Sequence, residues 1–192
     1  VVRHSMKIKC IFFIPLILLA LISCVNKNEN LKVDKKEIKS IISAVIKSEM
    51  IDDKISKGYV LNKLEKSQII LPQESDTIYE YPRTVQIETL KKYLKITNKT
   101  DLIFVISQNK NPTSFFINLK DSELITFFDI EQIENYETFY IITIPILNSG
   151  GNLAYVESNY YCGRLCGGGK AIILTKESGI WKIKEKFGTW IS

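Results

Sequence analysis

The clearest fold signal lies in residues 170–187, which have the sequence KAIILTKESGIWKIKEKF. Two runs rich in branched and aromatic residues, 170–176 and 180–187, flank Glu177-Ser178-Gly179, a combination typical of a β-hairpin. Because the side-chain period of a strand is two, the second run presents an apolar face and a basic face, formed by Trp181, Ile183 and Phe187 and by Lys182, Lys184 and Lys186. We expect the apolar face to be buried.

A second hairpin precedes this one. The β-rich runs 139–147 and 153–161 are separated by the turn cluster 148–152, which contains two glycines. Together the four runs predict an antiparallel meander. Pro145 has no N–H to donate to a ladder, so it is expected at a bulge or on a sheet edge.

An amphipathic helix is predicted to begin after Asp34. Asp34 is a good N-cap, and Glu37 stands at the position of its capping-box partner. Apolar residues then recur at helical spacing, namely Ile38, Ile41, Ile42, Val45 and Ile46. This stripe predicts a helix with one face in the core, packed against the apolar face of the last hairpin.

The middle of the chain is expected to add shorter elements. Residues 84–94 have mixed helical spacing after Pro82 and predict a second, shorter helix. Residues 102–106, Leu-Ile-Phe-Val-Ile, predict a buried strand by their length and β-branched content. The runs 59–61 and 68–71 predict short strands, and 108–114 a polar loop.

The fold class expected from this order is α+β. The N-terminal amphipathic helix and the shorter helix would pack on one face of a curved antiparallel sheet. A cone-shaped roll similar to nuclear transport factor 2-like or cystatin-like domains suits the order, although such an analogy carries no function.

The first residues resemble the signal of bacterial lipoproteins. Basic residues in 6–9 are followed by an apolar run over 10–21 and by Ser23 and Cys24, the pattern of a lipobox. The resemblance implies that Cys24 is lipidated and becomes the first residue of the mature chain. The expected organisation is a signal peptide over 1–23, with a possible upstream start artefact before Met6, a lipidated tether over 24–33 and one globular domain over 34–192.

Two alternative interpretations exist for the apolar run. A permanent transmembrane helix needs about 20 apolar residues, whereas 10–23 is shorter and contains Pro15. A secretory signal cleaved by the ordinary peptidase would also accept Ser23, and only Cys24 separates the two cases.

Composition excludes several functions for the mature chain. About 170 residues follow the signal, enough for one domain with a proper core. Of 26 basic residues three precede Cys24, which leaves about two more basic than acidic ones and gives no footprint for nucleic acid. The single histidine, His4, also precedes it, so histidine-based catalytic dyads and zinc sites are excluded.

Cys162 and Cys166 are the thiols left once Cys10 is removed and Cys24 acylated. They lie between two predicted strands in a glycine-rich segment, and an exported protein meets oxidising surroundings, which favours a local disulfide. A thiol redox site and a metal site are weaker alternatives, because the spacing is not Cys-x-x-Cys and two thiolates leave zinc underliganded. The tip, with Arg164 and Leu165, is a candidate recognition loop.

The C-terminal pattern also resembles a known group. It comprises Tyr161-Cys162-Gly163, Cys166-Gly167, Gly179-x-Trp181-Lys182-Ile183 and Trp190-Ile191-Ser192. This pattern is similar to that of small uncharacterised lipoproteins of Bacteroidetes-type bacteria, and it brings no catalytic residue with it. Asp76-Thr77-Ile78 resembles the O-glycosylation site of these bacteria, which would modify Thr77.

The function expected from these observations is a non-catalytic binding or interaction module, held at the cell envelope by a lipid anchor in the outer membrane. Its partners would be the membrane and an unknown protein or small molecule, without a cofactor, a metal or nucleic acid. Two alternatives remain open, an enzyme that uses carboxylates or tyrosines and a lipoprotein that protects its host against a toxin.

Overall fold

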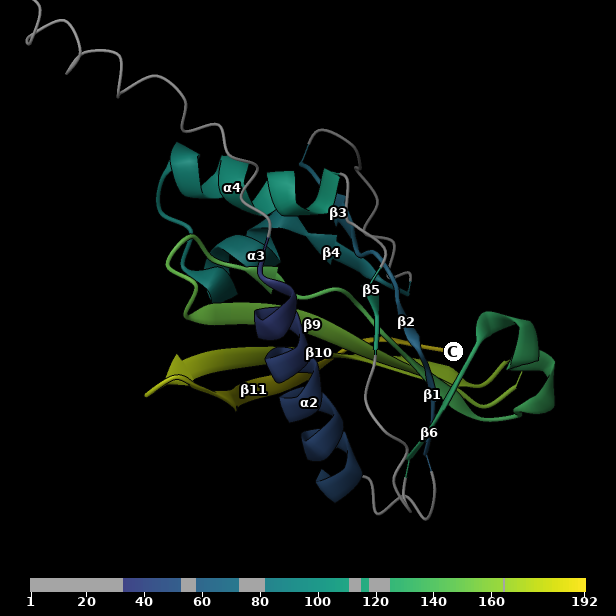
Figure 1. Ribbon diagram of the computed structural model, residues 1–192. Coiled ribbons are helices and arrows are strands. Elements are labelled where there is room, and N and C mark those ends of the chain that lie inside the picture. The colour runs from purple at the N-terminus through teal and green to yellow at the C-terminus, as the bar shows by residue number, and fades with distance from the viewer. Residues whose placement is uncertain (1–32, 53–57, 73–81, 111–114, 118–124, 164) are drawn as a thin grey trace, which may run out of the picture. The chain divides into compact units, whose positions relative to one another are not determined.

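The computed structural model describes residues 33–52, 58–72, 82–110, 115–117, 125–163 and 165–192. These residues form a mixed α and β structure in which helices accompany a large open sheet, and the predicted α+β class is confirmed (Figure 1). The signal segment, the tether up to residue 32, Cys24 and Thr77 lie outside the described residues, and so does Arg164.

The large sheet has the strand order β11-β10-β9-β7-β1-β6, with β8 paired to β9 beside β7. Its strands among the described residues are β1 (Gly58–Leu61), β6 (Ile125–Phe128), β7 (Phe139–Ile142), β8 (Ile146–Leu147), β9 (Leu153–Tyr161), β10 (Gly167–Glu177) and β11 (Ile180–Ile191). The antiparallel meander from β7 to β11 is confirmed. Pro145 lies in the break between β7 and β8, outside both strands.

The expectation of a wholly antiparallel sheet is wrong. β1 pairs in parallel with both β6 and β7, so the sheet is mixed. Parallel strands need long crossovers, and the chain between β1 and β6 supplies one. This crossover carries two small sheets, one joining β2 (Lys63–Leu64) to β5 (Phe115–Phe116) and one joining β3 (Gln68–Ile70) to β4 (Thr84–Gln86).

The predicted amphipathic helix is α2 (Lys35–Asp52). Asp34 caps it by accepting a hydrogen bond at 3.0 Å from the N–H of Lys36. The predicted apolar stripe is buried, from Ile46 at 9% exposure to Ile41 and Val45 at 0%. It packs against Ile172 and Leu174 of β10 and against Trp181, as the sequence predicted for Trp181.

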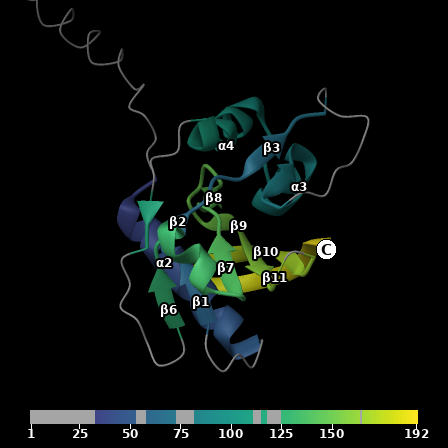
Figure 2. The same ribbon diagram turned by 90° about the vertical axis from the view of Figure 1, so that its right-hand side faces the viewer.

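The two helices predicted to share a face cover opposite faces of the sheet. α3 (Ile87–Leu94) and α4 (Lys99–Lys110) pack with Ala171 and Ile173, the residues of β10 that alternate with those under α2 (Figures 1 and 2). The sequence carries a signal for this arrangement, since 171–174 is continuously apolar, the pattern of a strand buried on both faces.

The predicted strand over 102–106 is helical, within α4. The side chain of Asn98 accepts a hydrogen bond at 2.9 Å from the N–H of Asp101, which caps the first turn. This local cap outweighs the β propensity of the apolar run. The helix continues to Lys110, so Gln108 is helical too, and its amide pairs with the backbone N–H and C=O of Leu147 at 3.1 and 2.7 Å.

Two irregularities in β11 change the expected alternation. Leu174 pairs with Ile183 and Ile173 with Glu185, so Lys184 is an extra residue in the ladder, and a second shift follows between Gly169 and Lys170. Between the first bulge and the second shift, the odd-numbered residues of β11 lie on the α3 face instead of the α2 face. Trp181 and Ile183 lie on the α2 face as predicted, but Phe187 lies on the α3 face, stacked on Tyr93 with ring centroids 4.8 Å apart.

Candidate functional site

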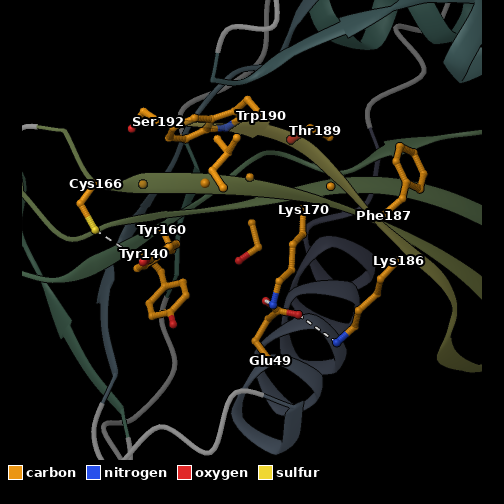
Figure 3. A pocket seen from close by; sticks show the side chains of 16 residues that line it. Glu49, Tyr140, Tyr160, Cys166, Lys170, Lys186, Phe187, Thr189, Trp190 and Ser192 are labelled. Atoms are coloured by element: carbon orange, nitrogen blue, oxygen red, sulfur yellow. Dashed lines mark hydrogen bonds and ion pairs between the residues drawn. The ribbon is translucent and has the colours of Figure 1, made fainter.

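A cavity of about 950 Å³ opens near the C-terminal end of α2, against the strands β7, β9, β10 and β11 (Figure 3). Side chains of Glu49, Tyr140, Tyr160, Lys170 and Lys186 border it. These residues come from five different elements, so only the folded chain brings them together.

Small residues leave room for this cavity. Ser158, Gly168 and Gly188 all belong to the lining, and Gly188 and Ser158 pair with Lys170 from either side. A Cβ atom added to Gly188 would meet nothing within 4 Å. One added to Gly168 would have ordinary contacts, the nearest at 3.5 Å. The open volume therefore depends on missing side chains rather than on a gap between elements.

The opposite face of the same strands is filled. Cβ atoms added to Gly167 and Gly169 would overlap the ring of Trp190, and that ring donates a hydrogen bond at 2.6 Å from Nε1 to Oδ1 of Asn159. Gly167 and Gly169 thus make room for the ring of Trp190, and the three consecutive glycines and Trp190 all belong to the cavity lining. The three glycines belong to β10, and not to a tight loop as their clustering suggested.

One wall of the cavity is aromatic. The rings of Tyr140 and Tyr160 lie side by side on β7 and β9, with centroids 6.0 Å apart. The hydroxyl of Tyr160 is 3.0 Å from Sγ of Cys162 and 3.6 Å from Sγ of Cys166. The Cα atoms of the two cysteines are 5.0 Å apart and their sulfurs are joined, which is consistent with the predicted disulfide.

The opposite wall is charged. Glu49 is only 7% exposed, and its carboxylate forms ion pairs with Nζ of Lys186 at 2.9 Å and of Lys170 at 3.8 Å. A carboxylate so far from water requires nearby positive charge. The lining side chains therefore carry two positive charges against one negative charge.

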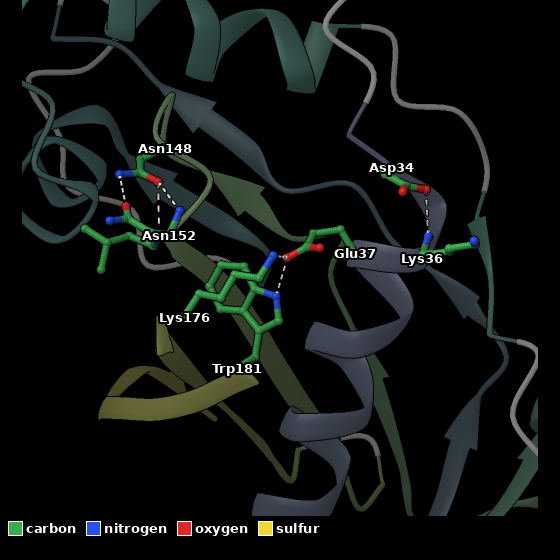
Figure 4. Close-up of polar contacts among 8 residues, drawn as sticks. Asp34, Lys36, Glu37, Asn148, Asn152, Lys176 and Trp181 are labelled. Carbon is green, nitrogen blue, oxygen red and sulfur yellow. Dashed lines mark hydrogen bonds and ion pairs between the residues drawn. The ribbon is translucent and has the colours of Figure 1, made fainter. Parts of the chain in front are cut away.

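The N-terminal half of α2 is attached to the same two strands. Glu37 accepts a hydrogen bond from Nε1 of Trp181 at 2.5 Å and forms an ion pair with Nζ of Lys176 at 2.6 Å (Figure 4). The predicted capping-box role of Glu37 is therefore replaced by contacts across the sheet. Carboxylates near both ends of α2 hold it on β10 and β11, which fixes one side of the cavity.

A second polar cluster lies on the other face of β9. Glu157 is fully buried and accepts a hydrogen bond at 2.7 Å from the hydroxyl of Tyr155. Burial raises the pKa of the Glu157 carboxyl to about 7, although hydrogen bonds from Tyr155, Arg83 and Asn159 lower it. Burial, with the nearby Glu157, also raises the pKa of Tyr155 well above its ordinary value. Residues 155, 157 and 159 have almost no exposed surface, so this cluster offers no open site.

The predicted recognition loop contributes little to the cavity among the described residues. Leu165 is 88% exposed and does not line it, whereas Cys166 does. Sequence reasoning missed Glu49, Lys170 and Lys186. The available signal was a pair of lysines on adjacent strands of one hairpin, but the bulges of β11 decide which face each lysine occupies.

Further searches of the described residues set limits on the site. No group of three or more histidine, cysteine, aspartate or glutamate residues could hold a metal ion there. None of the described helices has the length and apolar character needed to cross a membrane. Comparison of the chain with protein-family models, curated proteins and solved structures finds no match.

Proposed function

We propose that this protein is a lipid-anchored binding module of the bacterial cell envelope, and that its ligand is a small molecule held in the cavity beside α2. The observation that carries the proposal is the cavity, whose volume of about 950 Å³ falls in the range of about 300–1,000 Å³ typical of small-molecule sites. A few polar groups among aromatic rings are also typical of such sites.

A non-catalytic role agrees best with the carboxylates. Glu49 is engaged by two lysines, and Glu157 is enclosed on the other face of the sheet. A general acid or base must come within hydrogen-bond reach of its substrate. Glu49 is held by its lysines and Glu157 is enclosed, so a carboxylate mechanism has little support, whereas Tyr140 and Tyr160 border the cavity and leave the tyrosine alternative open. No observation favours toxin protection.

The likeness to a nuclear transport factor 2-like or cystatin-like roll is part of the proposal and concerns α2 with β7–β11. Support comes from a long helix lying against an antiparallel meander beside a cavity. The parallel strands β1 and β6 and the helices on the second face depart from such a roll.

The ligand site is tested on protein extracted from its own membranes. Native mass spectrometry of the wild-type protein should detect the additional mass of a small molecule that stays bound during extraction. Gly188→Leu should remove this mass, because a Cβ atom at Gly188 meets nothing within 4 Å and the new side chain would occupy the cavity that Gly188 lines. Lys184→Leu, on the same strand but exposed, is the matched control and should keep it. An equal added mass on all three proteins would contradict a cavity site.

The anchor is tested separately. Cys24→Ala should abolish incorporation of labelled palmitate and shift the protein out of the membrane fraction, because acyl chains contribute about 0.8 kcal/mol per buried CH₂. Continued labelling of the variant would refute the assignment of Cys24.

A further inference from the structure

We propose that Cys162 and Cys166 form a redox site that small thiol compounds reduce, in which Cys166 is the sulfur that is attacked and Tyr160 stabilises the departing thiolate of Cys162. The spacing Cys-x-x-x-Cys differs from the usual redox motif, so the inference rests on the arrangement of these three side chains. It goes beyond the proposed binding function and does not depend on it, because none of its steps requires the ligand of the cavity.

The disulfide adds little to the fold of the segment that it joins. The ladder between β9 and β10 already extends to the pair of Tyr161 with Gly167, and the N–H of Cys162 donates a hydrogen bond at 2.9 Å to the C=O of Cys166. A disulfide that closes so short a loop also gains the least from the chain-entropy effect. The backbone therefore holds the two cysteines close together whether or not their sulfurs are joined.

The disulfide lies within reach of a small thiol. Cys162 and Cys166 are both half-buried, and Leu165 between them is 88% exposed. Cys166 lines the cavity of about 950 Å³, and Figure 3 shows its sulfur directed toward Tyr160 at the edge of this cavity. Cys162 does not belong to the lining. A thiol that enters the cavity, which has room for a small molecule, therefore meets Cys166 first.

Tyr160 distinguishes the two sulfurs. Its hydroxyl oxygen is 3.0 Å from Sγ of Cys162 and 3.6 Å from Sγ of Cys166. A hydroxyl can donate a hydrogen bond to a thiolate, and hydrogen bonds to a charged acceptor are about twice as strong as neutral ones. Thiol–disulfide exchange is faster when the leaving thiolate is more stable. The geometry therefore favours attack at Cys166 and departure of Cys162.

Two exchanges complete the reaction. The thiolate of the first thiol molecule attacks Sγ of Cys166, a mixed disulfide forms there, and the electron pair of the broken S–S bond leaves on Sγ of Cys162. The thiolate of a second molecule attacks the sulfur of the first one and releases the thiolate of Cys166. The two thiol molecules give up two electrons and two protons and become one disulfide, and the two cysteines take these up as thiols.

Glutathione is the probe, because its mixed disulfide marks the sulfur that was attacked. The full-length protein in detergent micelles is exposed to reduced glutathione and quenched with iodoacetamide at increasing times. Mass spectrometry then locates both labels on the peptides that contain Cys162 and Cys166. We expect the disulfide to open, with glutathione mainly on Cys166 and the alkyl label mainly on Cys162. A disulfide that stays closed in a large excess of glutathione, or glutathione without a preference for Cys166, would overturn the proposal.

Two tyrosine variants isolate the role of Tyr160. Tyr160→Phe keeps the ring and removes the hydroxyl, so it should slow opening about tenfold, the effect of one hydrogen bond to a charged group, and should reduce the preference for Cys166. Tyr161→Phe is the matched control, because Tyr161 is the next residue of β9 and its ring stacks on Phe139 with centroids 5.3 Å apart. It should change neither the rate nor the preference. An unchanged rate and preference in Tyr160→Phe would overturn the role of Tyr160.

A purely structural disulfide is tested in parallel. The double variant Cys162→Ser, Cys166→Ser should remain folded, with a melting temperature lowered by less than about 8 °C relative to the wild type. Reduced wild-type protein should melt in the same range and should form its disulfide again when glutathione disulfide is added. Unfolding of the reduced protein, or failure to form the disulfide again, would assign the pair to structure alone and overturn the redox site.

Discussion

Glycine positions on β10 and β11 differ in what their missing side chains allow. A Cβ atom at Gly169 would overlap Trp190 and Thr189, whereas one at Gly188 would enter open space. Gly169→Ala should therefore destabilise the protein by about 1–3 kcal/mol, the usual range for overpacking a well-filled site. Gly188→Ala should change stability by less than about 1 kcal/mol. Urea unfolding of both variants measures the difference, and equal losses would mean that the ring of Trp190 moves aside freely.

Glu157 should make stability depend on pH. Its carboxyl has a pKa of about 7 in the folded protein against an ordinary value of 4.5. Between pH 4.5 and pH 7 the folded state holds a proton on Glu157 that the unfolded state has released. The contribution of Glu157 to the free energy of unfolding is therefore fully present below pH 4.5, falls as the pH rises and is lost above pH 7. The difference amounts to about 3 kcal/mol.

The test is the pH profile of Glu157→Gln, which keeps the shape of the carboxyl without its titration. Urea unfolding from pH 4 to 8 should give a wild-type free energy that declines relative to that of the variant across this window. Glu134→Gln, an exposed carboxyl, is the control and should run parallel to the wild type. Parallel profiles for Glu157→Gln would show that the folded protein does not hold the extra proton.

At the scale of elements, the last third of the chain could be predicted because its signals are local. The hairpins need only two-residue periodicity and turn residues such as Gly179, which has the positive φ of +81° that such a turn requires. α2 likewise follows from its cap and apolar stripe. These elements form the sheet and helix that border the cavity.

The remaining elements depend either on a local cap that outweighs composition or on distant partners. The run 102–106 has strand-like composition, and the cap from Asn98 decides for a helix. β1 finds its partners β6 and β7 more than 60 residues away, which no local pattern reveals. The cavity could not be predicted for the same reason, since the bulge at Lys184 places Lys186 rather than Phe187 on the α2 face.

Trp181 tests how α2 is held on the last hairpin. It is 4% exposed, packs in the core beneath α2 and bonds Glu37. Trp181→Ala should cost about 3–5 kcal/mol, a third or more of the stability of an ordinary domain. Lys184→Ala, on the same strand but exposed, should cost little. Thermal melts compare them, and equal melting temperatures would mean that Trp181 contributes no packing.

At the scale of the whole molecule, the two faces of the sheet have different roles. The α3 face is filled by Tyr155, Glu157 and Trp190, and the hydrogen bonds from Tyr155 to Glu157 and from Trp190 to Asn159 lie within the protein. The α2 face is filled only as far as the helix reaches, and beyond it the small residues Ser158, Gly168 and Gly188 leave the cavity. A rigid filled face supports an open one, which is the arrangement that a preorganised binding site requires.

The core supports a prediction about the anchor. The buried clusters among the described residues draw on side chains from Ile38 onward and include both faces of the sheet. A chain that begins at Val33 should therefore fold by itself, with a melting temperature within about 4 °C of that of the full-length lipoprotein, the shift expected for less than about 1 kcal/mol in a domain of this size. Differential scanning calorimetry of the two proteins in the same detergent measures the shift. A fall well beyond this range would mean that residues before Val33 contribute to the folded domain, and the division into a tether and a domain would have to be abandoned.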